Sequence, residues 1–136
     1  MLPDSIKVLI LEEQVRQDGR FINIDLDSYL IKLDANAEIV ADFIDGRCRG
    51  FAAYYCNDET AKRAFITLVL VDPQDRGLGL GQALTAFVLN ISKSRGFNVC
   101  RLEVNKSNQV AYKIYQAQGF YLVEDRGETY LLEVAL

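Results

Sequence analysis

The sequence predicts a mixed α/β (α+β) fold, in which a mostly antiparallel, twisted sheet contains one central parallel β-α-β pair and is flanked by helices. Before residue 72, β-rich runs are separated by short polar turns, which indicates antiparallel hairpins. After residue 76, a helical pattern separates one apolar run from the next, which indicates a parallel crossover. The chain has 136 residues and no linker-like stretch, so we expect a single domain over residues 1–136.

The first segment, from Pro3 to Gln17, is expected to be a helix because apolar residues recur in it at roughly helical spacing. The apolar run at residues 6–11 would also suit a first strand, so both assignments stay open. A second helix is expected to run to Ala37, with Asp27 or Ser28 as its N-cap.

Three strands are expected next. The runs Glu38–Ile44 and Arg49–Tyr55 are joined across Asp45-Gly46-Arg47, which is typical of a β-hairpin. A polar turn at residues 57–60 then leads to a third run, Ala64–Val71. These three strands should therefore be antiparallel to one another.

A helix should follow the glycine-rich turn and end near Gly96. Its apolar face is formed by Leu80, Leu84, Phe87, Val88 and Ile91. The next apolar run, Asn98–Val104, reads as a buried strand. Because a crossover of this length joins parallel strands, it should run parallel to Ala64–Val71.

The rest of the chain predicts one helix and one hairpin. The helix should run from about Ser107 to Gln118, with Val110, Ala111 and Ile114 turned inward and Gly119 as its stop. The runs Phe120–Glu124 and Glu128–Val134 should pair across Asp125-Arg126-Gly127.

Composition narrows the chemistry. The chain has no histidine and three cysteines without a C-x-x-C pair, which disfavours a zinc site and a histidine-based triad, so we expect no metal. A net charge of −4 argues against binding to nucleic acid or to an anionic membrane. No long apolar run and no secretory signal is evident, so we expect a cytoplasmic protein with no membrane segment.

Charge is distributed unevenly along the chain. Between residues 76 and 118, six basic residues accompany a single acidic one, Glu103. A basic segment around a glycine turn suits a polyphosphate small molecule, although solvated helix faces would give the same pattern.

The glycine turn itself is the strongest signal. An apolar run at residues 65–71 breaks at Pro73 and leads to Arg76-Gly77-Leu78-Gly79-Leu80-Gly81, after which helical periodicity resumes. A strand, a glycine turn and a helix in this order present free backbone N–H groups to an anion. The glycine spacing does not fit a dinucleotide fingerprint, and Gly81-Gln82-Ala83 does not fit a P-loop. The pattern that remains is Arg-x-x-Gly-x-Gly.

In this pattern the sequence resembles the GNAT superfamily of acyl-CoA N-acyltransferases, whose pyrophosphate signature is Gln/Arg-x-x-Gly-x-Gly/Ala between a strand and a helix. The segment Asn108-x-x-Ala111-x-x-x-Tyr115-x-x-x-Gly119-Phe120 is similar to a second motif of that family. The two motifs together cover residues 64–120, and the preceding hairpins suit the same GNAT-like fold.

The resemblance implies acetyl-CoA as the acyl-donor co-substrate. Its expected binding residues are Val69, Leu70, Val71, Arg76, Gly77, Leu78, Gly79, Leu80, Gly81, Gln82 and Asn108. In the family, the strand before the loop pairs with the pantetheine arm, so Val69 and Val71 should bond it and an N–H there should polarise the thioester carbonyl. Arg76 could instead be a surface residue, and Asn108 could instead cap its helix.

The resemblance also implies a general acid at Tyr115, which would protonate the departing thiolate; packing in the core is the alternative role for this tyrosine. Many members carry a glutamate on the strand before the loop as a base, but this strand offers Thr67, which could only hold a relaying water. We assign no base and leave Glu12, Glu13, Tyr54 and Tyr55 as alternatives. Contacts with the acceptor are expected from Thr67, Tyr54 and Tyr55.

The function that this resemblance implies is N-acetylation of a primary amine of a small molecule by direct attack on acetyl-CoA. Acetylation of a protein lysine or N-terminus, and a non-catalytic acyl-CoA sensor, are the alternatives. No nucleic-acid partner is expected, and a homodimer is compatible with the sequence.

Overall fold

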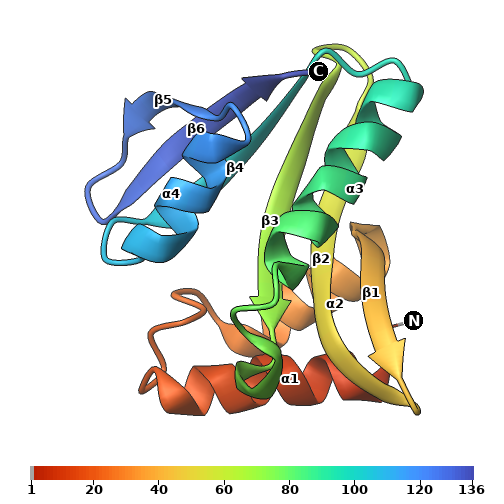
Figure 1. The fold of residues 1–136 in the computed structure, drawn as a ribbon, viewed down its shortest axis with the longest axis vertical. Coiled ribbons are helices and arrows are strands. Elements are labelled where there is room, and N and C mark those ends of the chain that lie inside the picture. Colours follow the sequence, from red (N-terminus) through yellow and green to blue (C-terminus); the bar gives the residue numbers. More distant parts are fainter. Residues whose placement is uncertain (1) are drawn as a thin grey trace.

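The computed structural model describes residues 2–136 as one sheet with helices on both faces (Figure 1). The helices are α1 (Asp4–Arg16), α2 (Leu26–Asn36), the short η1 (Pro73–Asp75), α3 (Leu80–Ser94) and α4 (Gln109–Ala117). The strands are β1 (Glu38–Ile44), β2 (Arg47–Asp58), β3 (Arg63–Val71), β4 (Val99–Asn105), β5 (Tyr121–Asp125) and β6 (Thr129–Ala135). None of the helices within residues 2–136 is long and apolar enough to span a bilayer.

The sheet has the order β1-β2-β3-β4-β6-β5, and β3 with β4 is its parallel pair. The remaining neighbours are antiparallel. Helices α1 and α2 bury their apolar residues against one face of the sheet, and α3 packs on the other face. The predicted mixed fold with a central parallel pair is therefore confirmed.

The first helix settles the open assignment at residues 6–11, because these residues are helical. Ile6 and Ile10 are each 1% exposed, and they share one core with Phe51 of β2. The predicted cap of α2 was wrong: the N-cap is Asp25, whose Oδ2 accepts hydrogen bonds from the backbone N–H and the hydroxyl of Ser28. Helix α2 therefore begins earlier than expected.

The first hairpin turns within two residues. Asp45 and Gly46 have φ of 50° and 77°, the left-handed values that suit a tight turn between twisted strands. Strand β2 is longer than predicted at both ends, because Arg47 already pairs with Ile44 and the strand continues to Asp58.

Helix α3 packs on the sheet through Leu84 and Val88, which are 5% and 0% exposed. Phe87 was predicted to lie on the same face but is half exposed. The buried face of α3 is formed by Leu84, Thr85, Val88 and Ser92, and Phe87 lies at its margin.

Helix α4 begins at Gln109 rather than near Ser107, because Asn108 is its N-cap. None of its residues is fully buried, and Val110, predicted to point inward, is 73% exposed. Ala111, Tyr112 and Tyr115 pack against the edge of the core, whereas Val110 and Ile114 border an open hollow, described below.

The two central strands are paired only over their first halves. Partners run from Arg63↔Val99 to Ile66↔Leu102, after which β3 pairs with β2 alone and β4 with β6 alone. Figure 1 shows the two strands diverging from their paired ends. The sheet therefore opens as a V in its middle.

A bulge lies where the V opens. On β2, Tyr54 pairs with Ile66 and the preceding Ala53 pairs with Leu68, so Thr67 is an extra residue of β3 without an opposite partner. The extra residue reverses the side-chain alternation. Ile66 faces the core under α3, whereas Leu68 faces the core under α1 and α2.

Candidate active site

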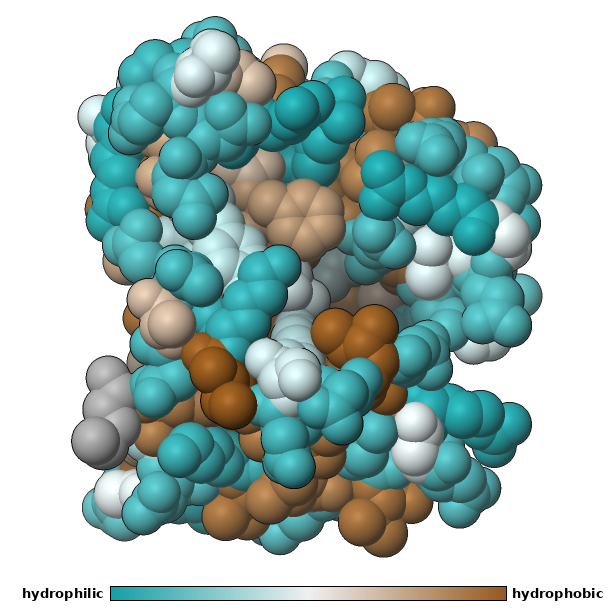
Figure 2. All heavy atoms as spheres, turned by 180° about the vertical axis from the view of Figure 1, so that it is seen from behind, coloured by the Kyte–Doolittle hydropathy of each residue, from teal (hydrophilic) through white to brown (hydrophobic). Residues whose placement is uncertain are grey.

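Two connected hollows lie at the open V. The loop hollow, about 580 Å³, is bordered by the glycine loop, the end of β3 and α4. The strand hollow, about 460 Å³, lies between the diverging halves of β3 and β4. Six residues border both and mark where they meet: Gln17, Phe21, Val69, Asn108, Ala111 and Tyr115. Figure 2 shows the surface hollowed between the upper and lower parts of the molecule.

The glycine loop presents unpaired backbone donors. Gly77 and Gly79 have φ of 83° and 78°, a conformation that side-chain-bearing residues rarely adopt. The first bond of α3 runs from the Ala83 N–H to the Gly79 carbonyl at 3.0 Å. Within residues 2–136, the N–H groups from Gly77 to Gln82 find no acceptor. Unpaired N–H groups at the N-terminus of a helix, together with the helix dipole, are the features that an anion-binding site requires.

The residues of this loop differ in how they face the hollow. Gly77, Gly79, Leu80, Gly81 and Gln82 border it, but Leu78 points away and is 72% exposed. The expectation of a contact from Leu78 therefore does not hold for its side chain, since glycines on both sides turn the chain sharply there.

The backbone conformation at Gly81 does not require glycine, in contrast to Gly77 and Gly79. Its φ is not left-handed, and a Cβ added there would meet Val71 Cγ2 at 3.7 Å and Val69 Cγ1 at 4.0 Å, which are ordinary contacts. Alanine would therefore fit at this position, narrowing the gap between α3 and the end of β3.

The Arg76 side chain is turned away from the glycine loop. Its Nε donates to the Val71 carbonyl at 3.1 Å, and its Nη2 donates to Glu13 Oε1 at 2.9 Å. Glu13 lies on α1, is 5% exposed and also binds Arg16 and Gln17. Burial tends to raise the pKa of Glu13, but the hydrogen bonds from Gln17, Arg16 and Arg76 outweigh it and hold the pKa below its usual value.

A second ion pair holds the start of the loop. Arg47 of β2 donates to Asp75 at 2.8 Å and lies 3.4 Å from Asp72. This pairing lowers the pKa of Asp75, chiefly through the hydrogen bond from Arg47. Both flanks of η1 are thus tied to other elements, α1 on one side and β2 on the other.

The basic residues between positions 76 and 118 do not gather around the glycine loop. Of the six cations between residues 76 and 118, only Arg76 borders the loop hollow. Arg95 pairs with Glu38 and Arg101 with Glu133. The groups that the glycine loop itself presents to the hollow are backbone N–H groups.

The open edge of β3 offers backbone groups to a ligand. The Asp72 N–H bonds to the Arg49 carbonyl on β2 at 2.8 Å. Because hydrogen-bonded residues alternate along an antiparallel pair, Leu70 also faces β2, whereas Val69 and Val71 face the open V. The Val71 carbonyl is occupied by Arg76, so the free groups are its N–H and both polar groups of Val69. Leu70 borders the hollow but is bonded to β2 and 5% exposed.

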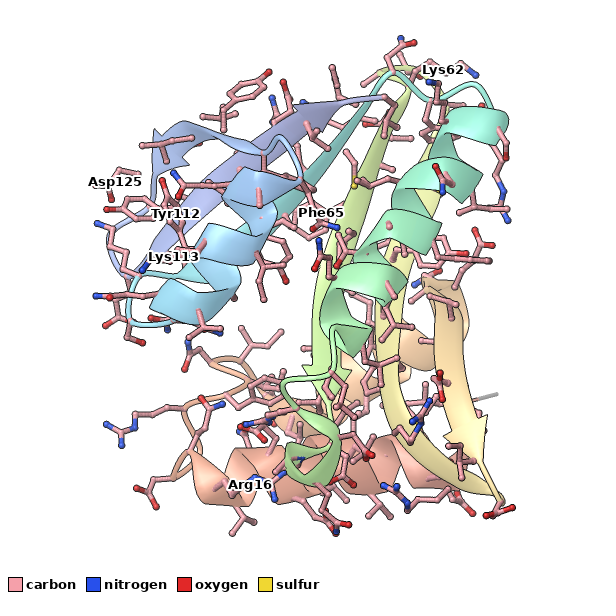
Figure 3. The ribbon with its side chains drawn as sticks, in the orientation of Figure 1. Arg16, Lys62, Phe65, Tyr112, Lys113 and Asp125 are labelled. Atoms are coloured by element: carbon pink, nitrogen blue, oxygen red, sulfur yellow. The ribbon has the colours of Figure 1, made fainter. Side chains whose placement is uncertain are left out.

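Tyr115 borders both hollows from α4. Its ring meets Phe120 edge-on at 5.7 Å, and its hydroxyl has no hydrogen-bond partner within the described chain, residues 2–136. Burial raises the pKa of Tyr115 to about 12. Tyr112, one turn earlier on α4, borders neither hollow, and its ring is 5.5 Å from that of Tyr130 (Figure 3).

Asn108 serves as a cap and also borders both hollows. Its Oδ1 accepts a hydrogen bond from the Ala111 N–H at 3.1 Å, which confirms the capping role. The amide NH₂ of the side chain remains available to a ligand.

The structure brings one of the three expected acceptor contacts to the site. Thr67 borders the strand hollow, and its Oγ1 lies 2.9 Å from the hydroxyl of Tyr29. Tyr54 is 4% exposed within the core under α3, and neither Tyr54 nor Tyr55 borders a hollow. Tyr54 packs into the core under α3, and the ring of Tyr55 lies beneath Lys32, whose Nζ is 5.7 Å from the ring centroid.

Glu103, which the sequence analysis did not assign, is the carboxylate of the strand hollow. It follows Leu102, the last residue of β4 paired with β3, and therefore stands at the opening of the V. Its oxygens accept from Arg126 Nη1 at 2.6 Å and Thr129 Oγ1 at 3.0 Å. The sequence feature that could have pointed to Glu103 is that it is the single acidic residue between positions 76 and 118. Gln17, the C-cap of α1, and Phe21, in the loop after it, were also unassigned, because nothing in the local sequence pattern links them to the site.

Comparison with known proteins bears directly on this site. The model of the acetyltransferase (GNAT) family matches residues 8–120. The chain is 33% identical over 96 residues to an uncharacterised N-acetyltransferase of Methanocaldococcus jannaschii, covering 68% of this chain and 42% of the relative. It is 42% identical over 55 residues to a mycothiol acetyltransferase of Thermobispora bispora, covering 40% of this chain and 19% of the relative. The chain thus spans less than half the length of these curated relatives.

A solved structure shares the fold. The PaiA N-acetyltransferase of Thermoplasma acidophilum, crystallised with coenzyme A, matches 100% of this chain and 80% of its own with a TM-score of 0.69 and 20% identity. The family match includes the glycine loop, the V between β3 and β4, and α4 with Tyr115. The chain therefore belongs to the acetyltransferase (GNAT) family.

Proposed function

We propose that the protein transfers an acetyl group from acetyl-CoA to a primary amine of a small molecule. The observation that carries this proposal is the meeting of the two hollows at Val69 and Tyr115, with unpaired loop N–H groups on one side and a carboxylate on the other. The strand hollow, at about 460 Å³, is within the size range of small-molecule sites.

The residues present suit acetyl-CoA, which would supply an activated thioester. The N–H groups from Gly77 to Gln82 would bind its pyrophosphate, because they are unpaired and lie at the N-terminus of α3. The free backbone groups of Val69 and Val71 would bond the pantetheine arm as an added strand would. The Val69 N–H, at the junction of the hollows, would donate to the thioester carbonyl and stabilise negative charge there.

Tyr115 is proposed to donate a hydrogen bond to the departing thiolate. With a pKa of about 12, the phenol stays protonated near neutral pH and so remains a donor. Complete proton transfer to a thiolate of pKa about 8.5 would be uphill by about 5 kcal/mol. Tyr115 therefore acts mainly by stabilising thiolate charge.

Glu103 is proposed to accept the proton of the acceptor amine, directly or through a water. An alkylamine of pKa near 10.4 is almost fully protonated at pH 7. Forming the neutral, nucleophilic amine at that pH therefore costs about 4.6 kcal/mol. Glu103 is the carboxylate bordering the strand hollow, and Arg126 and Thr129 hold its side chain in place.

The first experiment measures binding and turnover separately. Acetyl-CoA at 100 times its dissociation constant should stabilise the fold by about 2.7 kcal/mol, seen as a rise in melting temperature. A panel of small amines is then screened for CoA release. No shift at millimolar acetyl-CoA would refute the proposal, and a shift without turnover of any amine, peptides included, would favour a non-catalytic acyl-CoA sensor.

The second experiment compares two tyrosines on the same helix. Tyr115→Phe should lower kcat by roughly 10²-fold or more with little change in acetyl-CoA affinity. Tyr112→Phe is the matched control, since its ring packs against Tyr130 away from the hollows. Equal kinetics for the two variants would remove Tyr115 from the mechanism.

A further inference from the structure

Tyr29 of α2 contacts the bulge of β3 from the opposite side of the sheet to α3. Its hydroxyl lies 2.9 Å from Thr67 Oγ1 and 3.4 Å from the Thr67 carbonyl oxygen, to which it donates. The tyrosine is 8% exposed, and its ring shares the core under α1 and α2 with Leu33 and Leu68. Its hydroxyl is therefore fixed relative to the sheet.

Thr67 needs such a partner because it is the bulged residue. It has no opposite residue on β2, and β4 pairs with β3 only as far as Ile66. The carbonyl of a bulged residue is left out of the ladder, and an unpaired buried backbone group is costly. Tyr29 reaches both the carbonyl and the side chain of this one residue.

The bulge decides where the reacting backbone points. Since a one-residue shift reverses the direction of every following group in a strand, the extra residue at Thr67 sets Val69 to face the open V. Val69 is only two residues further along, at the junction of the hollows. Any relaxation of the bulge would therefore rotate the Val69 N–H.

We propose that Tyr29 is a positioning residue for acetyl transfer: by holding the bulge at Thr67, it aims the Val69 N–H at the thioester carbonyl. This inference rests on the proposed function. It assigns Tyr29 no contact with substrate, and its effect should fall on kcat more than on acetyl-CoA binding, because the loop N–H groups that hold the pyrophosphate lie outside the bulge.

The kinetic test uses substitutions that each remove one hydroxyl group. Tyr29→Phe keeps the ring and removes the hydroxyl, and Thr67→Val removes Oγ1 at constant shape. Each should lower kcat roughly fivefold to tenfold with KM for acetyl-CoA changed less than twofold. The double variant should be no worse than the more affected single one, because both changes break the same contact. Thr67→Ser, which keeps the hydroxyl, should retain more of kcat than Thr67→Val.

Tyr55→Phe is the matched control, a partly buried phenol on the same sheet that borders neither hollow. A merely structural role for Tyr29 predicts lower melting temperature with unchanged kcat, as for this control. That result, or additive losses in the double variant, would overturn the inference.

A second measurement does not depend on turnover. In protein without acetyl-CoA, Tyr29→Phe should shift the amide resonance of Val69 and speed hydrogen exchange at residues 67–69, while Tyr55→Phe should not. If wild-type protein acetylates no amine, the proposed function fails and the kinetic role of Tyr29 with it. If wild-type protein is active and the Val69 amide is unmoved by Tyr29→Phe, the positioning role alone is wrong.

Discussion

The Glu13 carboxylate on α1 accepts a hydrogen bond from Arg76 at 2.9 Å, across 63 positions of sequence. The same arginine donates to the Val71 carbonyl at the end of β3. This one side chain thus ties the first helix to the strand end and to the start of the glycine loop. Arg76 therefore acts as an internal brace, and the N–H groups of the glycine loop stay unpaired.

Replacing Glu13 by glutamine should loosen this brace. Hydrogen bonds to charged groups contribute about 1.5 to 3 kcal/mol, so Glu13→Gln should lower the free energy of unfolding by an amount in that range and weaken acetyl-CoA binding severalfold. Glu12→Gln, a change at the exposed neighbouring acid, should do neither. Chemical denaturation and calorimetric titration measure the two effects. Unaltered acetyl-CoA affinity in Glu13→Gln would mean that the loop holds its shape without the brace.

The same residue predicts a pH dependence of stability. The pKa of Glu13 is lowered in the folded protein from 4.5, so the unfolded chain binds the extra proton first as pH falls. Its stabilising contribution is therefore complete above about pH 4.5 and is lost on acidification through the folded pKa. Melting temperature measured from pH 6 to pH 3 should fall less steeply in Glu13→Gln than in wild type. Parallel curves would contradict this assignment.

Substitutions at two glycines with the same backbone conformation can distinguish an effect on stability from an effect on acetyl-CoA binding. Gly79 and Gly127 have φ of 78° and 88°, and a Cβ at either would meet nothing within 4 Å. Alanine at each should cost roughly 1 to 2 kcal/mol of stability through backbone strain alone. Only Gly79→Ala should also weaken acetyl-CoA binding, by about tenfold, since it redirects loop N–H groups. Equal affinities in the two variants would argue against pyrophosphate binding at this loop.

Glu103 and Glu124 provide a matched pair of acids, because both contact Arg126, at 2.6 Å and 3.5 Å. Only Glu103 borders the strand hollow. Glu103→Gln should lower kcat/KM for the amine by roughly 10²-fold near neutral pH, and raising the pH should restore part of the loss as the amine deprotonates itself. Glu124→Gln should stay within about twofold of wild type by the same reasoning. A pH-independent loss in Glu103→Gln would indicate a structural role instead.

Helix α4 should be the element most affected by ligand. It buries no residue fully, and Val110 and Ile114 border the loop hollow. Acetyl-CoA should cover this apolar side and slow amide hydrogen exchange in α4, since local opening is easiest where few apolar groups are buried. Exchange in β1 and β2 should change little. Equal protection of all elements would point to global stabilisation without contact at α4.

Much of the fold could be read from local patterns. Helical spacing, turn residues and glycine stops located the helices and strands because each depends on neighbours within a few positions. The free N–H groups of the glycine loop followed in the same way, since left-handed backbone at Gly77 and Gly79 is a local property. The errors concerned residues whose neighbours are distant in the sequence: the exposed Val110 borders an open hollow, and Tyr54 is buried in the core under α3.

By itself, the sequence determined the order of elements, the glycine turn before α3 and the position of Tyr115 on its helix, because these follow from spacing along the chain. The tertiary structure alone decided that Arg76 braces Glu13, that Thr67 bulges against Tyr29, and that Glu103 stands at the opening of the V. Each of these depends on strand register and on side chains that meet from separate elements. Such contacts are fixed by packing over tens of residues, which no local pattern encodes.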